Sequence, residues 1–131
     1  IVVNLDPMKS KQLNKGLEQL CEEGVAQLFV REVDGKAMIG TVGVLQFDVI
    51  QHRLENEYFA KCRFENLNYT KACWITSENS TILSDFIGRR KHQIAKDKDG
   101  RTVFLTETRW SLEREIKEQP DITFHSSAEI L

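Results

Sequence analysis

Two spacings of apolar residues alternate along the first half of the chain. Short runs rich in β-branched and aromatic residues are typical of strands, and they occupy residues 1–5, 25–33, 37–42 and 59–64. Between these runs, apolar residues recur every three to five positions and predict two helices, at 7–21 and 44–58. The order β-α-β-β-α-β is that of a ferredoxin-like split βαβ fold, in which two helices cover one face of an antiparallel sheet.

Local signals agree with these boundaries. Asp6 is placed to cap the first helix and Pro7 to start it, and Gly24 follows its end. Asp34 and Gly35 predict a hairpin turn between the second and third strands. The apolar face of the first helix is expected to contain Met8, Leu13, Leu17, Leu20 and Cys21.

The second predicted helix also has an apolar face. Phe47, Ile50 and Leu54 share one side of it, with Leu45 and Val49 beside them. We expect the first three in the core.

The second half of the chain continues the alternation. We expect strands at 71–76, 101–108 and 121–126 and helices at 79–88 and 110–116. Asp99 and Gly100 predict a turn, and Pro120 ends the last helix. The predicted fold class is α+β, with a ferredoxin-like core at 1–65 and a C-terminal α/β extension at 66–131 on the same structure.

Composition is that of a protein able to bury a core, since 40% of the 131 residues are hydrophobic and 29% are charged. The formal net charge of −2 gives no general attraction to nucleic acid or acidic membranes, so such contacts would need a local patch. No run approaches the ~20 apolar residues of a membrane helix, and we expect a cytoplasmic protein without membrane contact. The chain begins without Met in strand-like residues, as an excised piece of a longer protein does.

The search for chemistry finds no catalytic site. The sequence contains no phosphate-binding loop, dinucleotide-binding fingerprint or nucleophile elbow. The stretch DKDG is a turn, because Ala95 and Thr106 stand where a calcium loop needs its ligands. The cysteines form no CxxC pair and are expected as buried, reduced thiols: Cys21, Cys62 and Cys73. We therefore expect no enzyme activity, metal or cofactor in this chain.

The histidines lack partners at metal-ligand spacing and are expected as surface or packing residues: His52, His92 and His125. On the second helix, i,i+4 spacing predicts the pairs Asp48–His52 and Arg53–Glu57. A solvated helix face explains these residues better than an acid–base pair does.

A basic stretch at 88–98 stands out in a slightly acidic protein. Its cations are Arg89, Arg90, Lys91, Lys96 and Lys98. One interpretation is a patch that contacts RNA phosphates and displaces counterions. The other is a solvated helix end and loop, since Lys and Arg suit helix C-termini. A weaker basic strip, Lys9, Lys11 and Lys15, lies on the first helix.

The stretch GVLQFDVIQHRLENEY resembles the end of the third domain of translational GTPases of the elongation factor G type. The matching positions are Gly43, Leu45, Phe47, Asp48, Arg53, Leu54, Glu57 and Tyr58. Val44 and Gln46 depart from the elongation factor, and GVLQFDV is similar to bacterial peptide chain release factor 3. KACWITS and PDITFHSSAE resemble that family's C-terminal extension, so the likeness covers nearly the whole chain.

This resemblance implies the C-terminal domain of a GTP-binding factor of translation termination, which promotes departure of stop-codon-reading release factors from the ribosome. GTP or GDP with magnesium would bind the factor's N-terminal domain, outside this chain. The implied partners are ribosomal RNA and proteins, the factor's own G and β-barrel domains and, indirectly, the release factors. The outward side of the second helix would face the ribosome or a neighbouring domain: Gln46, Gln51, His52 and Arg53.

Two other functions compete with this one. A freestanding ferredoxin-like domain could bind RNA by stacking bases on aromatic residues of its sheet, with Phe29, Phe64, Trp74 and Phe104 as candidates. A small-molecule enzyme or regulatory domain of the same fold is the third.

Overall fold

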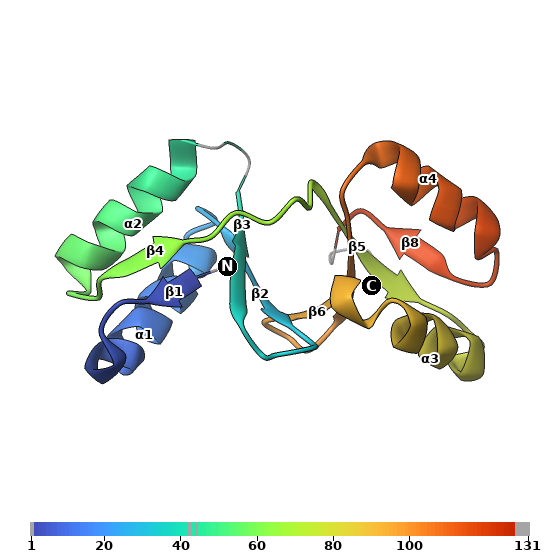
Figure 1. Ribbon diagram of the computed structural model, residues 1–131, viewed down its shortest axis with the longest axis horizontal. Helices are drawn as coiled ribbons and strands as arrows, with labels where there is room; N and C mark the ends of the chain where they lie inside the picture. Colours follow the sequence, from blue (N-terminus) through green and yellow to red (C-terminus); the bar gives the residue numbers. More distant parts are fainter. Residues whose placement is uncertain (1, 42, 44, 128–131) are drawn as a thin grey trace. The chain divides into compact units, whose positions relative to one another are not determined.

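The computed structural model describes residues 2–41, 43 and 45–127 of the chain (Figure 1). Its contacts divide the chain into two compact units. The first contains Ile1–Phe29 and Lys36–Leu67, and the second contains Val30–Gly35 and Asn68–Leu131.

The first unit has the predicted β-α-β-β-α-β order. Its elements are β1 (Val2–Asn4), the 3-10 turn η1 (Pro7–Lys9), α1 (Ser10–Glu22), most of β2 (Gln27–Arg31), β3 (Ala37–Gly40), α2 (Leu45–Glu57) and β4 (Cys62–Phe64). β1 and β4 form an antiparallel ladder in which Val3 lies opposite Arg63, while β3 lies beside β2. The fold class is α+β and is consistent with a ferredoxin-like domain, although the β1–β4 ladder is separate from the sheet that contains β2 and β3.

The core of the first unit forms where α1 and α2 meet. Its buried apolar residues are Leu13, Leu17, Leu20, Ala26, Ile50, Leu54, Ala60 and Cys62. The two helices approach closely at Gly16, which leaves no space for a side chain beside Leu54 and Tyr58. The predicted core residues Ile50 and Leu54 are therefore confirmed.

Met8 was expected on the apolar face of the first helix, and that prediction is wrong. Asp6 caps the short η1 turn instead, accepting a hydrogen bond from the Met8 N–H at 3.1 Å, and α1 begins only at Ser10. The 3-10 turn has a different periodicity from the α-helix, so Met8 is out of phase with the buried face and is 91% exposed.

The apolar face of α2 is narrower than predicted. Phe47 is half-buried, with its ring 5.7 Å from that of Phe64. Leu45, at 79% exposure, and Val49 lie in solvent rather than beside the core. Helical periodicity shows which side chains share an arc, but only the neighbouring elements decide how much of that arc is covered.

β2 is shorter than the strand predicted at 25–33. β2 ends at Arg31, and a turn follows in which the Gly35 N–H donates to the Arg31 carbonyl at 2.8 Å, with Gly35 at φ +69°. The connection is therefore longer than a two-residue hairpin.

The run at 59–64 begins with a helix cap rather than a strand. Phe59 has φ +56° and is 72% exposed, and the Ala60 N–H donates to the Leu54 carbonyl at 3.0 Å. This bond closes the C-terminus of α2 in the manner usually associated with glycine.

The second unit is built around an antiparallel sheet. Its elements are β5 (Lys71–Thr76), α3 (Ser80–Arg89), the 3-10 turn η2 (Lys91–Gln93), β6 (Ile94–Asp97), β7 (Thr102–Thr106), α4 (Arg109–Glu118) and β8 (Thr123–His125). β7 pairs with both β6 and β5, and β5 pairs with β8. The end of β2 belongs to this unit, and directly after it the Glu32 N–H donates to the Ile94 carbonyl at 3.0 Å. Within this unit the strand order is β6-β7-β5-β8.

Three aromatic rings organise the second core. Phe86 of α3 meets Phe104 of β7 and Phe124 of β8 edge to face, with ring centroids 5.1 and 6.1 Å away. Ile75, Ile94 and Ile122 complete the cluster. Edge-to-face contacts of this kind fix the relative orientation of the rings as well as burying them.

Candidate functional site

The predicted basic patch divides into outward and inward cations. Arg89, at the end of α3, and Lys91, in η2, are exposed, as is Lys98 in the turn after β6. Part of this stretch is the strand β6 rather than a solvated loop, which corrects that expectation. The four residues of β6 rise by about 13 Å in total, so Lys91 and Lys98 lie at opposite ends of that strand.

The other two cations of the patch are bound within the second unit. The Arg90 Nη2 lies 2.6 Å from Glu115 Oε1 of α4, and the Lys96 Nζ donates to Thr102 Oγ1 at 2.7 Å. These contacts hold α3 against α4 and β6 against β7. Arg90 and Lys96 therefore have structural partners, whereas Arg89, Lys91 and Lys98 have no ion pair within the part of the chain that the structure describes.

The predicted outward face of α2 divides in the same way. Gln46 and His52 are exposed. Gln51 instead donates to the Cys62 carbonyl at 2.9 Å, and Arg53 is paired with Glu23 at 3.1 Å. Gln51 and Arg53 thus tie α2 to β4 and α1.

The predicted i,i+4 pair of Arg53 with Glu57 is confirmed, at 2.7 Å. His52, which was expected to pair with Asp48, has Asn56 as its partner, with 3.2 Å between His52 Nδ1 and Asn56 Nδ2.

Asp97 organises the turn that the sequence predicted at DKDG. Its Oδ2 accepts a hydrogen bond from Trp74 Nε1 at 2.8 Å, and its Oδ1 accepts from the N–H groups of Asp99 and Arg101 at 2.9 and 2.8 Å. Burial by itself would raise the pKa of Asp97, but these bonds and the charge of Arg101 outweigh it and lower the pKa. Asp97 therefore remains a carboxylate with a structural role.

Cys62 and Cys73 are buried free thiols, as expected. Cys21 was also expected to be buried, but it is only half-buried. Burial raises the pKa of Cys62 to about 11 and also raises that of Cys73. A thiol held in its neutral form is a poor nucleophile and a poor metal ligand.

Neither a cluster that could bind a metal ion nor a helix that could span a membrane is found among the described residues. Over residues 2–41, 43 and 45–127, no three His, Cys, Asp or Glu side chains gather as a metal ion would require. Within the same ranges, no helix has both the length and the apolar character needed to cross a membrane.

The aromatic residues proposed for base stacking are not available on a sheet surface. Phe29, Trp74 and Phe104 are buried, and Phe64 is half-buried against Phe47. Stacking of unpaired bases needs exposed rings. The arrangement therefore does not favour a domain that binds RNA through its sheet.

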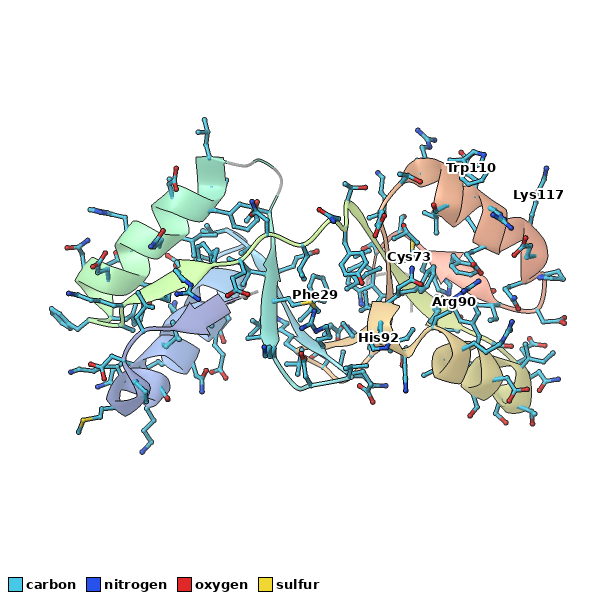
Figure 2. All side chains as sticks on the ribbon, viewed as in Figure 1. Phe29, Cys73, Arg90, His92, Trp110 and Lys117 are labelled. Atoms are coloured by element: carbon cyan, nitrogen blue, oxygen red, sulfur yellow. The ribbon has the colours of Figure 1, made fainter. Side chains whose placement is uncertain are left out.

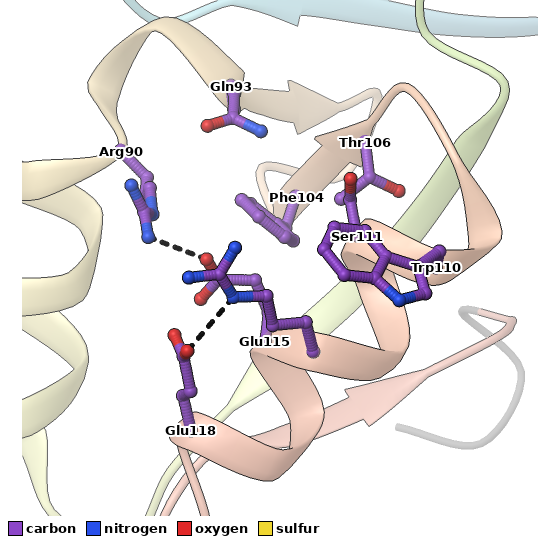
Figure 3. Close-up of a pocket in the computed structure, with 9 residues that line it drawn as sticks. Arg90, Gln93, Phe104, Thr106, Trp110, Ser111, Glu115 and Glu118 are labelled. Atoms are coloured by element: carbon purple, nitrogen blue, oxygen red, sulfur yellow. Dashed lines mark hydrogen bonds and ion pairs between the residues drawn. The ribbon is translucent and has the colours of Figure 1, made fainter.

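A pocket that the sequence did not predict lies between α3, β7 and α4 of the second unit (Figure 3). It has a volume of about 350 Å³, and its lining includes Arg90, Thr106, Trp110 and Glu115. Trp110 projects outward from α4 (Figure 2) and is 67% exposed. The sequence offered only the helical spacing of Trp110, because Arg90 and Glu115 are 25 residues apart and meet only in the folded unit.

Residues 1–115 match the model of the family described as "Class II release factor RF3, C-terminal domain". The chain belongs to this family. The match extends over 115 of the 131 residues and reaches from β1 into α4, so it includes elements of both units. It confirms the resemblance to release factor 3 that the GVLQFDV and KACWITS stretches indicated. As an RF3 C-terminal domain, the chain has a role in the function of a translation termination factor.

Proposed function

We propose that this chain is the ribosome-docking domain of a GTP-dependent translation termination factor and helps to release the stop-codon-reading release factors from the ribosome. The observation on which this proposal depends is the match to the RF3 C-terminal domain over residues 1–115. GTP or GDP with magnesium would bind a separate N-terminal domain of the factor, and this chain would supply no catalytic group. The factor's G and β-barrel domains would be its intramolecular partners.

A domain without a reactive site can still contribute to nucleotide-driven work. GTP binding or hydrolysis elsewhere in the factor can change the relative stability of two domain arrangements, only one of which fits a ribosome that carries a release factor. Each unit of this chain has a packed core, so each can present a defined surface to the ribosome.

We assign the contact with ribosomal RNA or protein to the outward cations Arg89, Lys91 and Lys98. They are exposed, and no described acidic group forms an ion pair with them. Arg90 and Lys96 are removed from this assignment because their charges already have partners within the fold. On α2, Gln46 and His52 remain as candidates for a second contact, since Gln51 and Arg53 are bound internally.

The test is a charge-reversal variant of the full-length factor: Arg89→Glu, Lys91→Glu and Lys98→Glu. An exposed charge contact contributes roughly 0.5 kcal/mol, so the three changes together should weaken ribosome binding about tenfold. Ribosome-stimulated GTP turnover at subsaturating ribosome concentration should fall accordingly, and nucleotide affinity should stay unchanged. The difference from the natural protein should shrink as salt is added.

A matched control reverses exposed lysines of the first unit: Lys11→Glu, Lys15→Glu and Lys61→Glu. This variant carries the same change in net charge and should turn over GTP normally. Unaltered turnover in the Arg89, Lys91 and Lys98 variant would return those residues to an ordinary solvated surface. Release-factor recycling by the factor with and without this domain then tests the wider function.

A further inference from the structure

The pocket of the second unit contains three buried polar atoms without hydrogen-bond partners. Within the described structure these are Arg90 Nε, Thr106 Oγ1 and Glu115 Oε2, and all three residues line the same pocket. Thr106 is only 1% exposed. Buried polar groups are normally paired because an unpaired one is costly, and three in one place call for an explanation.

The geometry of one ion pair accounts for two of the three atoms. Arginine and a carboxylate often meet side by side, with two parallel hydrogen bonds. Here the contact is end-on, because a single bond of 2.6 Å joins Arg90 Nη2 to Glu115 Oε1 (Figure 3). Arg90 Nε–H therefore remains a free donor and Glu115 Oε2 a free acceptor. Each of these atoms is attached to the same carbon as the atom that forms the ion pair, so the two lie next to the bonded atoms.

This arrangement selects the chemistry of an occupant. It must accept a hydrogen bond from Arg90 and donate one to Glu115 along the same edge. In a trans peptide group the N–H and C=O point in opposite directions, so a single peptide group does not meet this requirement. The primary carboxamide of Asn or Gln does, since its C=O and one N–H lie side by side.

The charges around the pocket favour a protein rather than a nucleic acid. Arg90 is paired with Glu115, and Arg114 is paired with Glu118 at 3.1 Å, so the lining is balanced in charge. Nucleic acid binding needs an excess of cations to displace counterions. Exposed Trp and Arg are the residues most often found at the centre of protein interfaces. Trp110 and Arg114 form such a pair at the mouth, with 5.7 Å between the guanidinium carbon and the ring centroid.

We propose that this pocket is a binding site for an Asn or Gln side chain of a partner protein. The carboxamide enters beside Trp110, accepts from Arg90 Nε–H and donates to Glu115 Oε2, with the Thr106 hydroxyl group completing the set. Trp110 and Arg114 lie at the mouth on the exposed side of α4 and shift to admit it. The proposal goes beyond ribosome docking by the outward cations, because neither Arg89, Lys91 nor Lys98 lines the pocket.

The first experiment is an NMR titration of the chain with N-acetylglutamine methylamide. Saturable shifts of the Trp110 indole and of the amides around Thr106 and Glu115 are expected. N-acetylmethionine methylamide, which has a side chain of matched length without the amide, should give none. Cytidine monophosphate tests the nucleic-acid alternative, because its base also presents a donor beside an acceptor.

The variant Thr106→Val separates binding from folding. It removes an unpaired buried hydroxyl group without changing side-chain size, so its thermal stability should equal or exceed that of the natural chain. Its Kd for the glutamine probe should nevertheless rise by roughly threefold or more, because a hydrogen bond to the occupant is lost. Trp110→Ala should also weaken binding, while Ile116→Ala, an exposed change on the same helix outside the pocket lining, should not.

Several outcomes would overturn the proposal. These are the absence of saturable shifts, equal shifts with the methionine probe, or an unchanged Kd in Thr106→Val. Binding of cytidine monophosphate in preference to the glutamine probe would replace the protein partner by a nucleic acid. If charge reversal at Arg89, Lys91 and Lys98 left ribosome-stimulated GTP turnover unchanged, the result expected from the NMR titration would be the same. The ribosome-docking proposal and the pocket proposal can therefore fail independently.

Discussion

Asp97 shows how one carboxylate can determine the geometry of a turn and the position of a tryptophan at the same time. Its two oxygens accept hydrogen bonds from the Trp74 indole and from two N–H groups of the turn between β6 and β7. Because the side chain is 8% exposed, these bonds are little weakened by water. Loss of the negative charge should therefore loosen both the turn and the contact to β5.

Asp97→Asn is predicted to lower the free energy of unfolding at pH 7 by about 1–3 kcal/mol, since hydrogen-bond donors are left facing an amide. The pKa of Asp97 is lowered in the fold from the ordinary 3.8. The stabilisation by its charge is therefore complete above that pKa and is lost as the pH falls through the lower folded value. Urea unfolding measures the difference in free energy of unfolding between the natural chain and Asp97→Asn. This difference should be constant from neutral pH to about pH 5 and should shrink below about pH 4.

Asp99→Asn is the matched control, because the Asp99 side chain is 51% exposed and contributes little through Arg101. Its effect should stay within about 0.5 kcal/mol at every pH. A difference for Asp97→Asn that persists unchanged to pH 2 would show that charge is not the source of the effect.

At the scale of elements, the contact between α1 and α2 depends on a glycine. Gly16 lies in the middle of α1, where glycine is ordinarily less favourable than alanine by about 1 kcal/mol. A Cβ at this position would lie 2.6 Å from Leu54 Cδ2 and 2.9 Å from Tyr58 Cγ. Leu54 is fully buried. Close approach of the two helices thus outweighs helix propensity.

Gly16→Ala is accordingly predicted to destabilise the chain by about 1–2 kcal/mol, because overpacking costs about 1–3 kcal/mol and propensity returns less than that. Gly88→Ala, in α3, provides the contrast, since its added Cβ meets nothing within 4 Å. That variant should be stabilised by up to about 1 kcal/mol. Thermal or urea unfolding of the pair measures both effects, and a stable Gly16→Ala protein would contradict the packing argument.

At the scale of the whole molecule, each unit has a core of its own among the residues that the structure describes. The first core joins α1 to α2, and the second joins α3 to the strands β5, β6, β7 and β8 around the three phenylalanine rings. The chain passes between the units at 29–30, 35–36 and 67–68. Damage to one core should therefore be concentrated in the unit that contains it.

Phe86→Ala is predicted to cost about 3–5 kcal/mol, and Leu54→Ala about 2–5 kcal/mol, through lost burial and cavity formation. Amide hydrogen exchange should show the loss of protection mainly in β5 and β7 for Phe86→Ala. For Leu54→Ala the loss should lie mainly in α1 and α2. Equal loss throughout the chain after either change would show instead that the two units unfold together.

Local signals predicted much of the fold correctly. The strand at 71–76 was placed correctly, and Asn79 caps α3 by accepting from the N–H groups of Thr81 and Ile82. The left-handed conformation of Phe59 after α2 was not predicted, because glycine usually occupies that position of a helix cap. The prediction that Leu45 lies beside the core was wrong, because helical periodicity does not reveal which part of the apolar face of α2 is covered by neighbouring elements.

The candidate sites were less accessible to sequence reasoning than the fold. Clustering along the sequence grouped Arg90 with Arg89 and Lys91, but the side chain of Arg90 pairs with a glutamate 25 residues later. Trp74 and Asp97 are 23 residues apart and meet through a hydrogen bond across the sheet. No spacing rule anticipates such contacts.

The sequence by itself determined the order of strands and helices apart from β6, most turns and caps, and the membership in the RF3 C-terminal domain family. These features are encoded by residues that lie close together in the chain or by short sequence motifs. Only the tertiary structure decided which cations face outward and where the pocket with its unpaired donor and acceptors forms. Those outcomes depend on distant segments meeting in space, and their energies arise only when the segments are packed.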